Sequence, residues 1–220
     1  MRPLRHLPPN TSWFVTSRCL QAQYLLRPDK EMTKRFGYWL GRALKRHPGI
    51  ELFAAVQMSN HFHFVLKAAT SELASFMAYF EANLAKAINQ LRKRTGTVFH
   101  RRYSAEPILD EAAFDDRILY TVINPVRAGL VRSHEQWPGV ILYSKTTVTD
   151  YTFEWFDEAK HERHRKHRIF YPRHHYLRTM ILRLATLKNE GAIASAIKLE
   201  EERVRQARKG LGVLGPSLQL

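Results

Sequence analysis

The pattern of apolar and polar positions over the first 140 residues predicts a regular succession of strands and helices. Short runs rich in β-prone residues predict strands, and longer stretches with apolar residues three or four apart predict helices. The predicted strands cover residues 13–20, 50–58, 62–68 and 105–109. The predicted helices cover residues 28–47, 72–94 and 110–124. Ser59-Asn60 indicates a tight antiparallel hairpin, and Pro125 is expected to end the third helix.

This order of elements predicts an α+β fold. A strand–helix–strand–strand–helix–strand–helix succession is typical of a ferredoxin-like or RRM-like antiparallel sheet with helices on one face. The pattern changes after Trp137-Pro138-Gly139. We therefore expect a first domain over residues 1–140, an irregular basic linker rich in His and Arg over 141–173, and a helical C-terminal extension over 174–220.

Charge and cysteine content narrow the class of protein. The chain has 35 Lys and Arg against 20 Asp and Glu, a formal net charge of +15, which favours a polyanionic partner such as nucleic acid. The single Cys19 excludes a disulfide framework and any Cys-rich zinc site. No apolar run approaches the roughly 18 residues that span a bilayer. We expect a cytoplasmic protein with no membrane association.

His61 and His63 form the sharpest local feature, in the run Asn60-His61-Phe62-His63-Phe64. Side chains alternate between the faces of a strand, so both imidazoles point the same way while the phenylalanines point the other way. Two neighbouring imidazoles can hold one divalent ion. His-x-His alone belongs more often to a strand that carries two half-exposed histidines.

A second feature lies on the helix that ends at Asn124. Tyr120 and Asn124 are four residues apart and therefore share a helix face, while the apolar residues occupy the other half. Tyr120 could be an amphipathic residue at the edge of the packed face. It could also act as a nucleophile, because a metal ion held by two histidines and an oxygen donor polarises a phosphodiester and stabilises the departing 3′-oxygen.

The sequence resembles a known family at this point. Met58-Ser59-Asn60-His61-Phe62-His63-Phe64-Val65-Leu66 resembles the His-hydrophobe-His motif of the HUH single-tyrosine transposases. The run from Tyr120 to Val131 resembles the signature of the REP-associated tyrosine transposases, in which a tyrosine precedes Asn-Pro-Val-Arg-Ala-Gly-Leu by four residues. Phe14–Arg18 and Phe99–Tyr103 resemble two further blocks of the family. The similarity covers about residues 10–135.

The resemblance implies a function as well as a fold. It implies a catalytic domain over residues 1–140, a metal site formed by His61, His63 and Asn124, and Tyr120 as nucleophile. The metal would be Mg²⁺ or Mn²⁺, and the substrate single-stranded DNA that folds into hairpins at imperfect palindromes. The product would carry a 5′-phosphotyrosine and a free 3′-hydroxyl. Such a protein would be bacterial and nucleoid-associated, and either a monomer or a homodimer.

Basic residues near these motifs are candidates for contacts with DNA phosphates. The candidates are Arg18, Arg101, Arg102, Arg117, Arg127, Arg132, Arg203 and Arg205. The last two belong to residues 193–207, which fit either a helix-turn-helix or a pair of packed helices. The His- and Arg-rich stretch 161–175 fits either a segment lying on DNA phosphates or a solvated linker.

Two other functions are compatible with the sequence. The first is a hairpin-specific or sequence-specific DNA-binding protein without strand cleavage, which would retain the same four residues for structural reasons. The second is an RNA-binding module, because the same sheet topology serves RNA recognition. The chain lacks the Lys/Arg-Gly-Phe motif expected on the central strands of such a sheet.

Overall fold

The computed structural model describes residues 7–144, 150–213 and 215. Its main feature is a five-stranded sheet with the order β4-β1-β3-β2-β5, in which every neighbouring pair is antiparallel. The strands are β1 (Thr11–Arg18), β2 (Ile50–Gln57), β3 (His61–Ala68), β4 (Ser104–Ile108) and β5 (Ile141–Tyr143). The first four have the ferredoxin-like order, so the predicted fold class is confirmed.

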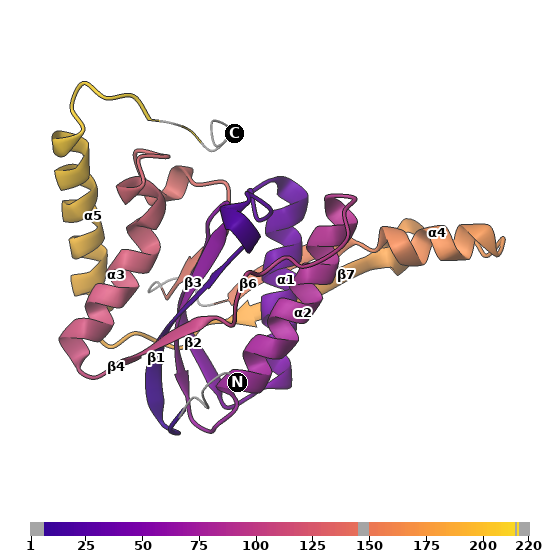
Figure 1. Cartoon of the computed structure of the whole chain (residues 1–220), viewed down its shortest axis with the longest axis horizontal. Helices are drawn as coiled ribbons and strands as arrows, with labels where there is room; N and C mark the ends of the chain where they lie inside the picture. The colour runs from indigo at the N-terminus through magenta and orange to yellow at the C-terminus, as the bar shows by residue number, and fades with distance from the viewer. Residues whose placement is uncertain (1–6, 145–149, 214, 216–220) are drawn as a thin grey trace.

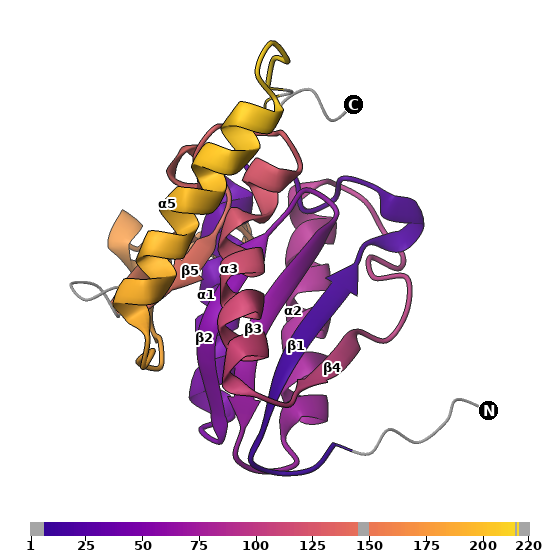
Figure 2. The ribbon, with the colours of Figure 1, turned by 90° about the vertical axis from the view of Figure 1, so that its left-hand side faces the viewer.

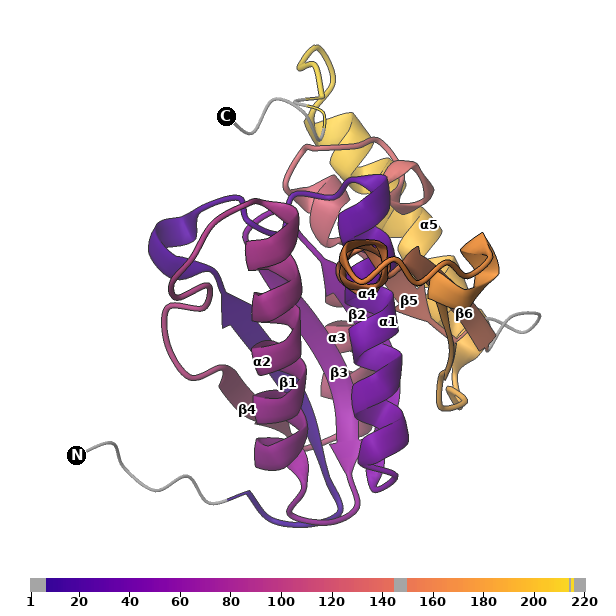
Figure 3. The same cartoon turned by 90° about the vertical axis from the view of Figure 1, so that its right-hand side faces the viewer.

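Two helices cover one face of the sheet, as Figures 1 and 3 show. They are α1 (Lys30–Arg46) and α2 (Leu73–Leu91). Asp29 caps α1 by accepting hydrogen bonds from the backbone N–H groups of Glu31 and Met32. Every second side chain of β3 points into the core between the sheet and these helices. The aromatic rings of this core belong to Phe36, Phe62, Phe64, Phe76 and Phe80.

Two further helices cover the other face of the sheet (Figures 1 and 2). They are α3 (Glu111–Arg127) and α5 (Glu190–Ala207). The expected placement of helices on one face thus describes α1 and α2 only. The second layer follows from Phe14 and Val65, which point away from α1 and α2 and are buried in a separate cluster with residues of α3 and α5. A sheet that is apolar on both faces needs a cover on each.

Pro125 does not end α3, contrary to the prediction. It lies in the last turn of the helix, which continues to Arg127. Gly129 ends the helix instead, with φ +72° and its N–H donating to the Val126 carbonyl. The N–H of Leu130 donates to the Pro125 carbonyl, which completes a Schellman motif. Proline so close to a helix end removes only one internal hydrogen bond, and the glycine satisfies the last carbonyls.

The segment expected to be an irregular linker, residues 141–173, is largely structured. It contains β5 at the edge of the main sheet, β6 (Asp150–Phe156) and α4 (Glu158–Lys166). β6 pairs with β7 (Leu177–Arg183) in a separate two-stranded sheet. Three short 3₁₀ turns complete the chain, at Leu20–Ala22, His134–Gln136 and Arg173–Tyr176. The residues 145–149 of the expected linker lie outside the described residues.

Residues 193–207 form neither of the two alternatives, a helix-turn-helix or a pair of packed helices, because α5 is one continuous helix over these residues. Ile193, Ile197 and Glu201 are buried at a spacing of four, so one buried stripe runs along the helix without a break for a turn. Residues 177–183 form β7, not the start of a helical extension. Among the described residues, no helix is long and apolar enough to cross a membrane.

Candidate active site

The His-x-His pair lies on the face of β3 that is covered by α3. His63 is only 3% exposed and His61 is half-buried. Phe62 and Phe64 point to the opposite face and pack in the core beneath α1 and α2. The alternation predicted for the strand is therefore present, with the two imidazole rings 4.8 Å apart between centroids.

Neighbouring side chains of β1 hold the His63 ring in one orientation. Thr16 lies opposite His63 in the β1–β3 register, and its Oγ1 is 2.8 Å from His63 Nδ1. Phe14 stacks on the imidazole with ring centroids 5.0 Å apart and an angle of 16°. His63 Nε2 is buried and has no hydrogen-bond partner among the described residues. Such an orphaned nitrogen is uncommon in a folded protein and marks a place where a ligand atom would be expected.

His61 is oriented by its own neighbour in the chain. Its Nδ1–H donates to Asn60 Oδ1 at 2.6 Å, because an amide oxygen can only accept. This bond leaves the lone pair of Nε2 for another partner. Burial lowers the pKa of His61 to about 4, and the charge of Arg18 adds to that effect. Burial lowers the pKa of His63 to about 2, with smaller contributions from His61, Arg18 and Arg117. Both imidazoles are therefore neutral at pH 7.

Tyr120 of α3 lies against the same imidazole. Its ring meets His63 edge to face at 5.5 Å between centroids and Phe14 at 5.7 Å. The guanidinium of Arg127 lies 5.8 Å from the centroid of the Tyr120 ring. Asn124 follows Tyr120 by one helical turn and is 8% exposed. A strand and a helix from distant parts of the sequence thus place the ring of Tyr120 against the imidazole of His63.

The predicted basic residues fall into two groups. Arg18, Arg101, Arg102 and Arg132 are exposed. The others make ion pairs: Arg117 with Glu106 at 3.4 Å, Arg127 and Arg203 with Glu200 at 2.9 and 3.7 Å, and Arg205 with Glu202 at 2.8 Å. Arg18 and Arg117 act on the pKa of His63, and Arg127 lies over Tyr120. Among the described residues, Arg203 and Arg205 make their ion pairs within α5 and not with residues around the imidazoles.

Phe14, Thr16 and Asn60 belong to the site, although sequence reasoning gave them no role there. The sequence indicated Asn60 only as a hairpin residue and as part of the run that resembles the His-hydrophobe-His motif. It indicated Phe14 and Thr16 only as parts of a block that resembles the family. The strand register supplies the missing signal. β1 runs antiparallel to β3 with Thr16 opposite His63 and Arg18 opposite His61, so residues of β1 that share the face of the imidazoles must border them.

The donor set fits a divalent metal ion. Two neutral imidazoles, each with Nδ1 at hydrogen-bond distance from an oxygen, could present Nε2 to Mn²⁺, which accepts imidazole ligands, whereas Mg²⁺ favours oxygen donors. Among the described residues, no group of three or more His, Cys, Asp or Glu is arranged around a possible ion. An oxygen of Asn124, of water or of a bound phosphate would therefore complete the coordination.

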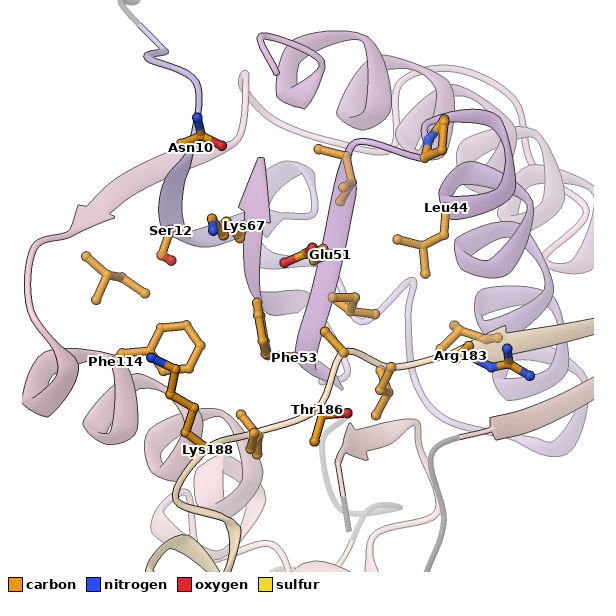
Figure 4. A pocket seen from close by; sticks show the side chains of 18 of the residues that line it. Asn10, Ser12, Leu44, Glu51, Phe53, Lys67, Phe114, Arg183, Thr186 and Lys188 are labelled. Carbon is orange, nitrogen blue, oxygen red and sulfur yellow. The ribbon is translucent and has the colours of Figure 1, made fainter. Parts of the chain in front are cut away.

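A separate cavity of about 1110 Å³ is lined by residues near the start of α3, by residues of β2 and α1, and by residues that follow β7 (Figure 4). Phe53 and Phe114 meet edge to face in its wall, at 5.0 Å between centroids. The lining includes Lys67 and Lys188 as well as the acidic Glu51, so it carries both signs of charge (Figure 4). Of the described residues that line this cavity, none is His61, His63 or Tyr120.

Comparison with solved structures places this arrangement in a known fold. A REP-associated tyrosine transposase bound to a REP hairpin aligns with a TM-score of 0.52 and 18% identity, over 63% of this chain and 81% of that one. The chain has the fold of that transposase. The likeness is one of fold, because the identity is low.

Two other structures align less well. A bacterial tRNA(His) guanylyltransferase-like protein in complex with ATP gives a TM-score of 0.48 at 9% identity, over 91% of both chains. The tRNA(His) guanylyltransferase of Saccharomyces cerevisiae gives 0.45 at 10% identity, over 59% of this chain and 64% of that one. No family model matches the sequence, and no curated protein matches it.

Proposed function

We propose that the protein is a metal-dependent endonuclease and strand transferase that acts on single-stranded DNA at hairpin-forming repeats. The observation that carries the proposal is the position of Tyr120, whose ring lies 5.5 Å from that of His63, a residue with a buried and unpartnered Nε2. The resemblance of the sequence around His61 and Tyr120 to REP-associated tyrosine transposases supports the same reading. So does the net charge of +15.

Tyr120 and Arg127 would carry out the strand-cleavage step. Tyr120 Oη would attack the scissile phosphorus, form a 5′-phosphotyrosine bond, and release the 3′-oxygen, which takes up a proton. The phenolic proton would leave to solvent, and the guanidinium of Arg127 would stabilise the charge that develops on the phenolate. A later attack by a 3′-hydroxyl on the same phosphorus would transfer the strand and restore the tyrosine.

His61, His63 and Asn124 would hold the metal ion, whose charge polarises the phosphodiester. Thr16 and Phe14 keep the His63 ring oriented before any ligand binds, so little reordering is needed on binding. One chain supplies His61, His63 and Tyr120 together, which supports a site that is complete within a monomer.

Replacement of Tyr120 by Phe tests the proposal. The probe is a library of single-stranded DNA in which a hairpin is flanked by randomised sequence, incubated with the protein and Mn²⁺ and analysed on a denaturing gel. The wild-type protein should form a covalent adduct, and Tyr120→Phe should lose it completely while DNA affinity changes less than about twofold, because only the nucleophilic oxygen is removed. Tyr24→Phe, which removes the hydroxyl of an exposed tyrosine, should keep the adduct.

Two outcomes would contradict the proposal. An adduct that survives in Tyr120→Phe would exclude Tyr120 as nucleophile. Tight binding of the hairpin library by the wild-type protein without any adduct would instead favour a DNA-binding protein that does not cleave.

A further inference from the structure

The segment between β6 and β7, residues 157–176, forms an arm that projects from the body of the protein (Figure 1). It contains α4 and the 3₁₀ turn Arg173–Tyr176. The arm extends from the side of α1, whereas α3 lies on the other face of the sheet (Figures 1 and 3). Tyr120 belongs to α3 and therefore lies on that other face. Any partner of the arm therefore contacts the protein away from the candidate active site.

The base of the arm is held rigidly. Arg35 of α1 has no exposed surface, lies 4.9 Å from the centroid of the Trp155 ring, and bonds to the Glu158 carboxylate at 3.5 Å. Asp157 accepts a hydrogen bond from the N–H of Lys160 and pairs with Arg178 at 3.0 Å. The arm is thus an ordered extension of the core and not a loose linker.

The outer part of the arm concentrates positive charge. Residues 158–175 contain six Lys and Arg and five His against two Glu. No residue of α4 is buried. Among the described residues, Arg163, Lys166 and Arg168 make no ion pair, although Arg165 pairs with Glu162. Like charges at this density repel one another, and a polyanion that neutralises them would relieve the repulsion.

Exposed aromatic side chains follow the basic helix directly. Phe170 is 81% exposed, Tyr171 is 48% exposed and Ile169 is 42% exposed. Large apolar side chains at the end of a projecting arm gain nothing from the core of their own chain. Bases of a single strand stack on such rings, whereas paired bases of a duplex offer them no face. Basic and aromatic residues side by side favour unpaired nucleic acid over an acidic protein.

We infer that the arm is a second DNA-binding surface, which holds an unpaired stretch of the substrate strand remote from the cleavage site. This inference rests on the proposed function in that it takes DNA as the substrate. Arg163, Lys166 and Arg168 contact the phosphates, and Phe170 stacks on a base.

Binding measured against oligonucleotide length tests the inference. Fluorescent single strands of increasing length are titrated with Tyr120→Phe protein without metal, so that cleavage plays no part. Affinity should rise once the strand is long enough to reach the arm. In the variant R163Q/K166Q/R168Q, affinity should no longer rise with strand length, and the longest strand should bind about tenfold more weakly at 150 mM salt. The slope of log affinity against log salt should be smaller by about 2, because three phosphate contacts are lost.

Matched variants separate the arm from the general charge of the protein. R42Q/K86Q/K93Q removes the same charge from exposed positions on and beside α1 and α2 and should change affinity less than twofold. Phe170→Ala should weaken binding of the long single strand about fivefold and leave a blunt duplex of the same length unaffected. Circular dichroism of each variant verifies that the fold is intact.

Three results would overturn the inference. Equal losses of DNA affinity in the arm variant and in the matched control would mean that the arm contributes only to the overall positive potential of the protein. An arm effect that does not depend on strand length would place the contact at the cleavage site. Stronger arm-dependent binding of RNA than of DNA of the same sequence would identify RNA as the partner. None of these measurements depends on an adduct at Tyr120. The proposed cleavage and the proposed DNA binding by the arm can therefore be refuted separately.

Discussion

At the scale of single residues, the two imidazoles of β3 are prepared in different ways. His63 is fixed by Thr16 and by the Phe14 ring, whereas His61 is fixed by the amide of Asn60. Both pKa values are lowered by burial, to about 2 for His63 and about 4 for His61. A neutral imidazole whose other nitrogen is already engaged presents a defined lone pair, which is what a metal ligand requires.

Metal binding provides the first prediction at this scale. His61→Ala and His63→Ala should each weaken Mn²⁺ binding by at least about tenfold, because each removes one nitrogen ligand. Isothermal titration with Mn²⁺ measures the effect, and circular dichroism shows whether the fold persists. His167→Ala, which removes an exposed imidazole of the arm, should bind Mn²⁺ like the wild type. Unchanged binding in both site variants would exclude this ligand set.

The buried surroundings of Glu81 in α2 change the pKa of its carboxyl group. Burial raises the pKa of its carboxyl from 4.5 to about 7, and the nearby Ser17 hydroxyl opposes the shift only in part. Glu81 Oε1 and Ser17 Oγ are both buried, and neither has a well-aligned hydrogen-bond partner among the described residues. The folded state therefore binds this proton more tightly than the unfolded state does.

This difference in proton affinity between the folded and unfolded states determines how the free energy of unfolding changes with pH. The free energy of unfolding should fall as the pH rises from about 4.5 to about 7, because the unfolded state releases this proton in that range while the folded state still holds it. Glu81→Gln removes the charge and should raise the free energy of unfolding by about 1 to 2 kcal/mol at pH 8, with little gain at pH 4. Urea denaturation at both pH values measures it. The exposed Glu51→Gln should show no such pH-dependent gain.

At the scale of elements, two glycines of α1 allow the β6–β7 hairpin to dock. Gly37 and Gly41 are four residues apart and share a helix face. A Cβ atom at Gly37 would lie 2.2 Å from the Phe153 ring, and one at Gly41 would lie 2.4 Å from Met180. The hairpin thus approaches the helix backbone more closely than any larger residue permits, and it carries the arm with it.

This close approach predicts opposite effects for two Gly→Ala substitutions. Gly37→Ala should lower the free energy of unfolding by about 1 to 3 kcal/mol, because Phe153 must move, although alanine favours a helix. At Gly191 in α5, an added Cβ atom would have no other atom within 4 Å. Gly191→Ala should therefore raise the free energy of unfolding by up to about 1 kcal/mol. Urea denaturation measures both, and hydrogen exchange in β6 and β7 should be faster only in Gly37→Ala. A stabilised Gly37→Ala would show that the hairpin is not tightly packed.

At the scale of the whole molecule, α5 closes the second layer through polar contacts as well as apolar ones. Glu201 accepts hydrogen bonds from the backbone N–H and the Nδ1–H of His134, both at 2.7 Å. The Tyr143 hydroxyl donates to His134 Nε2 at 3.1 Å. These groups are all buried, and they join α5 to β5 and to the segment after α3. Glu200 pairs with Arg127, so the same helix also fixes the cation beside Tyr120.

The basic charge of the molecule is distributed over its two sides. Arg18 and Arg117 act on His63, and Arg127 lies over Tyr120, on the α3 side of the sheet. The arm carries a second concentration of basic residues and extends on the α1 side (Figures 1 and 3). A long polyanion in contact with both regions would pass around the body of the protein. The arm experiment described above tests this arrangement, because its effect appears only with long strands.

The local pattern of the sequence determined the ferredoxin-like core. Strand alternation around Phe62 and Phe64, helical spacing in α2 and the Ser59-Asn60 turn are short-range signals, and they predicted the order and approximate bounds of the elements up to α3. Strand periodicity also placed His61 and His63 on one face. These features depend on backbone geometry within a few residues, which neighbouring side chains specify.

Only the tertiary structure decided what depends on distant contacts. Gly129, whose φ is positive, and the packing of α3 on the sheet let the helix continue through Pro125. The β6–β7 pairing organised a stretch whose local composition resembles a solvated linker. Register between β1 and β3 set Thr16 against His63, and the second helical layer brought Tyr120 to the same imidazole. Such proximities arise from long-range packing, which no local period of the sequence encodes.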